Sequence, residues 1–79
     1  MNLPTSRAKV TEALQLLKQG NPHGADELLV PLIHEGGVVA DAAAIAVNWI
    51  GLGLPGMART ELEGFLRKTA LRNHLEVAK

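Results

Sequence analysis

The sequence contains no cysteine and has no excess of charge of either sign. Without cysteine, its 79 residues can form neither a disulfide nor a thiol site, which fits a cytoplasmic protein. Eight basic residues balance eight acidic ones, so nothing in the net charge points to nucleic acid or to an anionic membrane. We expect one small domain, 1–79, with a core of limited stability by itself.

A membrane-spanning segment is also missing. The longest apolar run, residues 38–50, has 13 residues and includes Asp41 and Asn48, so it is too short and too polar to span a bilayer. The first residues lack the charged and apolar regions of a signal peptide. We therefore expect a cytoplasmic protein that is not inserted in a membrane.

Patterns typical of catalysis and metal binding are absent as well. His23, His34 and His74 show no HxxxH or HExxH spacing. Ser6, the only serine, has no histidine at a motif spacing and is better read as a helix cap. The glycines of residues 51–56 follow no predicted strand and precede no Gly-Lys-Ser/Thr, which indicates a turn rather than a phosphate loop. We expect no enzymatic activity, no cofactor and no metal.

What the sequence does contain is a series of helical patterns. The first helix is predicted to start near Thr5 or Ser6, either of which can cap it, and to run to about Gln19. The second is predicted to start at Pro22, where the missing N–H does no harm, with Asn21 as its cap. These two helices would form one hairpin.

Two further helices follow. Pro31 should kink the second helix or end it near Val30. The third helix, about residues 39–52, is apolar almost all round, and the fourth starts at Pro55. Because the chain is short, the other three helices can cover only part of the third, and we expect something else to cover the rest.

The two hairpins repeat. Each of five residues in the first hairpin matches one 33 positions later, and the matching residues are small, apolar or turn-forming. The pairs are Gly20 and Gly53, Pro22 and Pro55, Ala25 and Ala58, Leu29 and Leu62, and Leu32 and Phe65. After Thr69 the helical phase slips, so that Leu71 and Leu75 would point away from Leu62 on an unbroken helix. Either the chain breaks near Ala70 and the tail folds back as a short C-terminal capping helix, or these leucines meet a partner.

Helix pairs repeating at this interval resemble tetratricopeptide repeats, whose period is about 34 residues. In the second copy, Ala46, Trp49, Gly53 and Ala58 occupy positions characteristic of the family. The first copy departs from the pattern, with Lys9 and Glu12 at positions that are usually large and apolar. The resemblance implies an all-α fold of two antiparallel hairpins whose first helices line a concave face. Mapped onto this chain, that face consists of Val10, Leu14, Leu17, Ala43, Val47 and Ile50.

A narrower similarity is to the small chaperones of type III secretion needle subunits. It rests on residues 17–20 and 50–54, each followed by an alanine-bearing helix. This resemblance implies a protein that holds an amphipathic needle-subunit helix in its concave groove and prevents early polymerisation.

Together these patterns predict a non-enzymatic protein-binding module or chaperone that holds an apolar amphipathic helix of a partner. The predicted partner-binding residues are Val10, Leu14, Leu17, Ala43, Val47, Ile50, Leu71 and Leu75. Two alternatives stay open. The tail helix can lie in the groove itself, or the same surface can join copies of the chain, as in a small structural homo-oligomer or regulatory subunit.

Overall fold

The computed structural model describes the backbone of residues 3–78 and the side chains of residues 3–70. Within that backbone are four α-helices and no strand. The helices are α1 (Leu3–Lys18), α2 (Pro22–Ile33), α3 (Gly37–Gly51) and α4 (Pro55–Ala78). The predicted all-α fold of about four helices is therefore confirmed.

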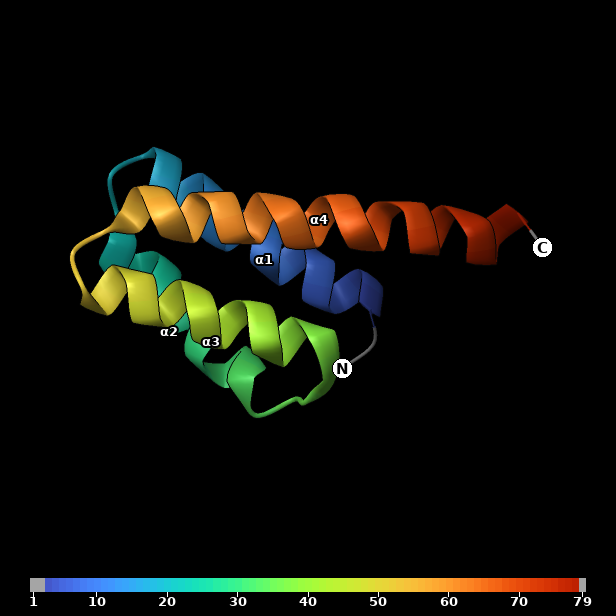
Figure 1. Cartoon of the computed structure of the whole chain (residues 1–79), viewed down its shortest axis with the longest axis horizontal. Coiled ribbons are helices and arrows are strands. Elements are labelled where there is room, and N and C mark those ends of the chain that lie inside the picture. The colour runs from blue at the N-terminus through green and yellow to red at the C-terminus, as the bar shows by residue number, and fades with distance from the viewer. Residues whose placement is uncertain (1–2, 79) are drawn as a thin grey trace.

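The helices run alternately in opposite directions and form a closed bundle (Figure 1). Each helix packs against the next one along the chain, and α4 also packs against α1. The α1–α2 and α3–α4 turns lie at the same end of the bundle, and the α2–α3 connection lies at the other (Figure 1). The return of α4 to α1 closes the space between the two hairpins.

The 33-residue repeat is visible in the two turns. Gly20 and Gly53 both adopt the left-handed conformation, with φ of +77° and +78°, which glycine adopts without a Cβ clash. In each turn the glycine N–H donates to the carbonyl three residues earlier, and the next N–H donates to the carbonyl five residues earlier. The donor–acceptor pairs, 2.8–3.1 Å apart, are Gly20–Leu17, Asn21–Leu16, Gly53–Ile50 and Leu54–Trp49. Both hairpins therefore end their first helix with the same Schellman geometry.

The core repeats in the same way. Positions 33 residues apart in the two hairpins are buried alike, and small alanines at two of these positions suit close helix packing. The fully or almost fully buried pairs are Ala13 and Ala46, Ala25 and Ala58, Leu29 and Leu62, and Leu32 and Phe65. Trp49, on α3, is half-buried and packs against this core.

The helix starts follow the sequence in one case and not in another. The Asn21 side chain accepts a hydrogen bond from the Gly24 N–H at 3.0 Å, and Pro22 is the first helical residue, as predicted. The expected start of α1 at Thr5 or Ser6 is wrong, because the helix already begins at Leu3. Ser6 is only 2% exposed and lies on the core-facing side of α1, four residues before Val10.

The helix ends also differ in part from expectation. α2 continues through Pro31 to Ile33 rather than ending near Val30. Pro31 removes the hydrogen bond to the carbonyl of residue 27, but it lies in the last turn of α2, so only Leu32 and Ile33 follow it in the helix. α4 runs as one helix to Ala78, so the tail forms no separate capping helix. The side chains of Leu71 and Leu75 lie outside the described residues.

Candidate functional site

The face predicted to bind a partner is not open. Four of the predicted residues are buried in the core between the helices: Val10, Leu14, Leu17 and Ala43. Val47 and Ile50 are half-buried and pack against the same core. A partner would reach the four buried side chains only if the helices separated.

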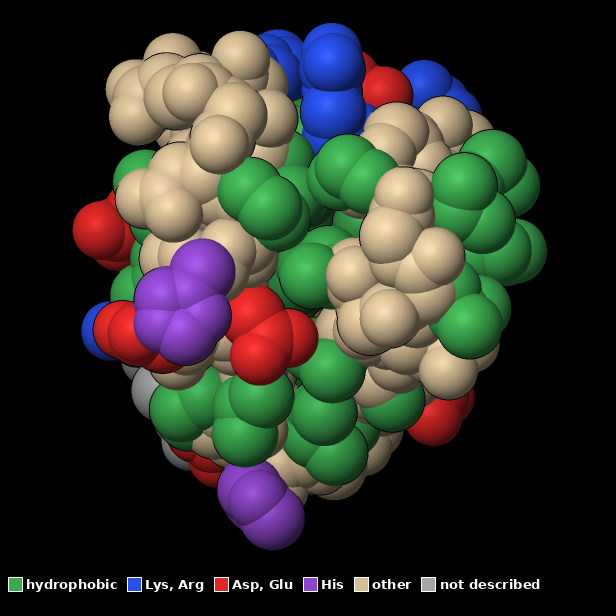
Figure 2. All heavy atoms as spheres, turned by 90° about the vertical axis from the view of Figure 1, so that its left-hand side faces the viewer, with side chains coloured by type: hydrophobic (Ala, Val, Ile, Leu, Met, Phe, Trp, Pro, Cys, Tyr) green, Lys and Arg blue, Asp and Glu red, His purple; other side chains and the backbone are tan. Residues whose placement is uncertain are grey.

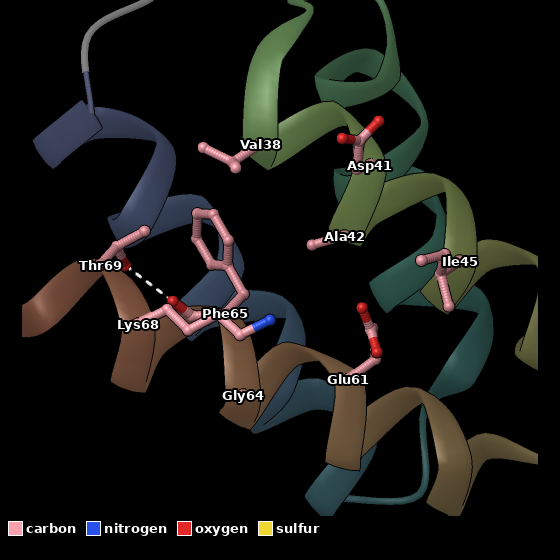
Figure 3. Close-up of a pocket in the computed structure, with 9 residues that line it drawn as sticks. All are labelled: Val38, Asp41, Ala42, Ile45, Glu61, Gly64, Phe65, Lys68 and Thr69. Carbon is pink, nitrogen blue, oxygen red and sulfur yellow. Dashed lines mark hydrogen bonds between the residues drawn. The ribbon is translucent and has the colours of Figure 1, made fainter.

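An open groove lies instead between α3 and α4, with a volume of about 270 Å³ (Figure 3). Each helix contributes side chains at the i, i+3, i+4 and i+7 positions of one face, with one further residue on α4. The lining residues are Val38, Asp41, Ala42 and Ile45 of α3, and Glu61, Gly64, Phe65, Lys68 and Thr69 of α4. This spacing places the groove along two neighbouring helices, where a third helix can lie.

The floor of the groove and two residues of its α3 rim are apolar. Ala42 and Phe65 are buried and belong to the core. On the α3 rim, Val38 is 54% exposed and Ile45 is 43% exposed. Large aliphatic side chains that remain half in water gain only part of the free energy that full burial would give. As the sequence predicted, the other three helices leave part of α3 uncovered in the described structure.

Gly64 lines the groove and has no side chain that would fill it. It lies in the interior of α4, outside the positive-φ region that requires glycine. A Cβ added there would meet no atom within 4 Å. Because glycine in a helix interior costs about 1 kcal/mol relative to alanine, this residue reduces the stability of α4. Neither the backbone conformation nor the packing within the described residues explains why position 64 is glycine.

The first repeat provides an internal comparison. At four positions 33 residues earlier, α1 and α2 carry a polar side chain or a proline in place of an apolar residue or the glycine, whereas at Asp41 and Glu61 the first repeat has the apolar Ala8 and Leu28. The pairs are Thr5 and Val38, Lys9 and Ala42, Glu12 and Ile45, and Pro31 and Gly64. The α3 residues Val38, Ala42 and Ile45 are therefore not apolar because every hairpin of this kind requires it at these positions.

The groove carries charges of both signs. Figure 3 shows Asp41 and Glu61 on opposite sides of it, the first on α3 and the second on α4. Lys68 lies two turns after Glu61, about 10 Å further along α4 at about 1.5 Å per residue. Two carboxylates and one ammonium group therefore border an apolar floor.

A hydrogen-bonded contact from α1 holds the Thr69 end of the groove. Nη1 of Arg7 donates to the carbonyl oxygen of Leu66 at 2.8 Å and also to Oγ1 of Thr69. The Thr69 hydroxyl in turn donates to the carbonyl oxygen of Phe65 at 2.8 Å. Thr69 is buried, and its hydroxyl is satisfied as both donor and acceptor. This contact ties α4 to α1 immediately beside Phe65.

Comparison of the chain with protein-family models, curated proteins and solved structures finds no match. Among the residues described, no three His, Cys, Asp or Glu side chains are grouped so that they could hold a metal ion. In the same part of the chain, no helix combines the length and the apolar character needed to cross a membrane. The groove is thus the feature from which a function can be argued.

A second exposed apolar cluster lies at the α3–α4 turn and consists of Leu52, Leu54 and Met57. Figure 2 looks at the end of the bundle that carries both turns, where apolar side chains reach the surface. None of these three side chains lines the groove between α3 and α4. The groove is the main site because it offers a hollow of about 270 Å³ for a partner's side chains.

Sequence reasoning missed the residues that give the groove its chemistry, namely Asp41, Glu61, Gly64 and Lys68. The 33-residue repeat indicates the core, because its two copies agree at the buried positions. The signal for the groove lies where the copies differ, at exposed positions such as Thr5 and Val38.

Proposed function

We propose that this chain is a non-enzymatic protein-binding module that receives an amphipathic helix of another protein in the α3–α4 groove. The observation that carries this function is an unfilled groove in the second repeat. Its apolar α3 residues Val38, Ala42 and Ile45 match the polar Thr5, Lys9 and Glu12 of the first repeat. A helix with apolar residues at i, i+3, i+4 and i+7 would lie between α3 and α4 and cover Val38 and Ile45.

The expected affinity is moderate. Full burial of a valine or isoleucine contributes about 1.5–3 kcal/mol, so covering the exposed halves of Val38 and Ile45 adds roughly 1.5–3 kcal/mol in all. Association costs at least several kcal/mol in lost freedom, so further contacts along the groove are needed. Such a balance favours a partner that is held and released, as by a chaperone or adaptor.

The similarity to chaperones of type III secretion needle subunits gives the function a more specific form. In that form the bound helix belongs to a secretion subunit and is kept from polymerising until it is released. The residues that carry the similarity, 17–20 and 50–54, form the two turns that the structure shows to be equivalent.

Site-specific photo-crosslinking in the host tests the function. A photoreactive residue at Ile45 should capture a helical segment of a different protein, whereas the same residue at Gln15, exposed on α1, should not. A synthetic peptide of the captured segment should then bind the wild-type domain. The double variant Val38→Thr, Ile45→Glu introduces the first repeat's residues at two exposed positions and should abolish this binding. Val30→Glu, at an exposed apolar residue outside the groove, should leave it unchanged.

Two results would contradict this function. Equal capture at Ile45 and Gln15 would mean that the groove has no partner. Capture of a second copy of the chain, together with a concentration-dependent dimer in sedimentation, would establish self-association through this surface.

A further inference from the structure

The size of the groove suits one large anchoring side chain. An apolar cavity of about 150 Å³ is enough to hold a benzene ring, and this groove has about 270 Å³. Its floor is formed by Ala42 and Gly64, which leave space, and the ring of Phe65 lies beside them (Figure 3). Aromatic rings pack favourably against another ring in offset or edge-to-face geometry. A phenyl or indole group therefore fits this position better than a short aliphatic side chain.

The charges around the groove favour a cation next to that ring. Asp41 and Glu61 border it from opposite sides, and Lys68 is the one cation among the lining residues. Two carboxylates and one ammonium group leave the groove with one net negative charge, so a positively charged group between Asp41 and Glu61 is favoured over a negatively charged one.

We infer that the bound helix anchors itself through a large aromatic side chain seated over Gly64, with a lysine or arginine about one turn away that faces Asp41 and Glu61. The helical nature of the ligand rests on the proposed function. The preference for an aromatic ring beside a cation rests on the groove alone and can be measured without the partner.

Three small probes separate the two preferences: tryptamine, indole and indole-3-propionate, which share a ring and differ in charge. Each is titrated into the methyl-labelled domain at low salt, and the methyl resonances of Ala42 and Ile45 are followed by NMR. Tryptamine should bind about fivefold more tightly than indole-3-propionate, with indole in between, as expected for exposed charges. The double variant Asp41→Asn, Glu61→Gln should remove this order.

Gly64→Leu tests the anchoring position, because the leucine side chain would fill the space above Gly64 where the aromatic ring is proposed to lie. We expect at least about tenfold weaker tryptamine binding, since about 1.4 kcal/mol of lost contact is tenfold. Gly56→Leu is the matched control in the same helix: its Cβ also meets no atom within 4 Å, but it lies outside the groove. This control should bind tryptamine like the wild type. Circular dichroism of both variants checks that they keep their helices.

The inference is overturned if no probe shifts the groove methyls saturably, if Gly64→Leu binds like the wild type, or if the charge order is reversed. These failures differ from failure of the proposed function. If tryptamine binds but photo-crosslinking at Ile45 finds no partner, the preference of the groove for an aromatic ring beside a cation is supported, and the helix-binding function fails. If a partner peptide binds and keeps its affinity when its aromatic residue is changed to alanine, the helix-binding function is supported and the aromatic anchor is contradicted.

Discussion

Replacing Gly64 with alanine should make the isolated domain more stable. Gly64 lies in the interior of α4, and the added Cβ meets no atom within 4 Å, so the methyl group causes no clash. Alanine exceeds glycine in helix propensity by about 1 kcal/mol. For a domain of this size, a gain of about 1 kcal/mol corresponds to a rise in Tm of roughly 4–8 °C. Thermal and urea unfolding followed by circular dichroism would measure it.

Gly53→Ala is the matched comparison, because the same substitution should have the opposite sign there. Gly53 has φ of +78°, and forcing alanine into that conformation costs about 1–2 kcal/mol. If Gly64→Ala lowers stability instead, something occupies the space above Gly64 in the free domain, and the groove is not open. If both variants are more stable, the left-handed turn at Gly53 is wrong.

Four further substitutions test the fold around the groove. Arg7→Met should lower the free energy of unfolding by about 1–2 kcal/mol in urea titrations, because it removes the charged donor to α4 but leaves the Thr69–Phe65 hydrogen bond intact. Leu54→Asn should raise Tm, with a gain of up to about 1 kcal/mol, by giving α4 the side-chain cap that Asn21 gives α2; a lower Tm would mean that the exposed leucine stabilises the turn. Leu29→Ala and Leu62→Ala should each cost about 2–5 kcal/mol, and similar values would support the equivalence of the two repeats.

The sequence predicts the helices and turns because local residues determine them. Glycine at 20 and 53 ends a helix in the left-handed conformation, and proline at 22 and 55 starts the next. The buried alanines and leucines follow from helical periodicity and from the 33-residue repeat. The start of α1 is not predicted correctly because Ser6 is buried inside the helix and does not cap it. A capping serine and a buried serine look alike in the sequence.

The open face of α3 could not be predicted in the same way. Because α3 is apolar nearly all round, its periodicity does not say which side the other helices cover. The prediction placed the open surface at Ala43, Val47 and Ile50, whereas the structure exposes Val38 and Ile45. The packing of α4 against α1 connects residues far apart in the chain, and no local pattern encodes it. The feature of the sequence that does point to the groove is the difference between the two repeats at matching exposed positions.

A chemical-shift map of the domain with its crosslinked partner peptide tests the central claim most directly. The backbone amides of residues 38–45 and 61–69 should shift on titration, since they border the groove. The amides of residues 28–36, which match residues 61–69 in the first repeat, should not shift and serve as the internal control. Shifts confined to the turn at residues 52–57, or spread through the core, would contradict helix binding in the α3–α4 groove.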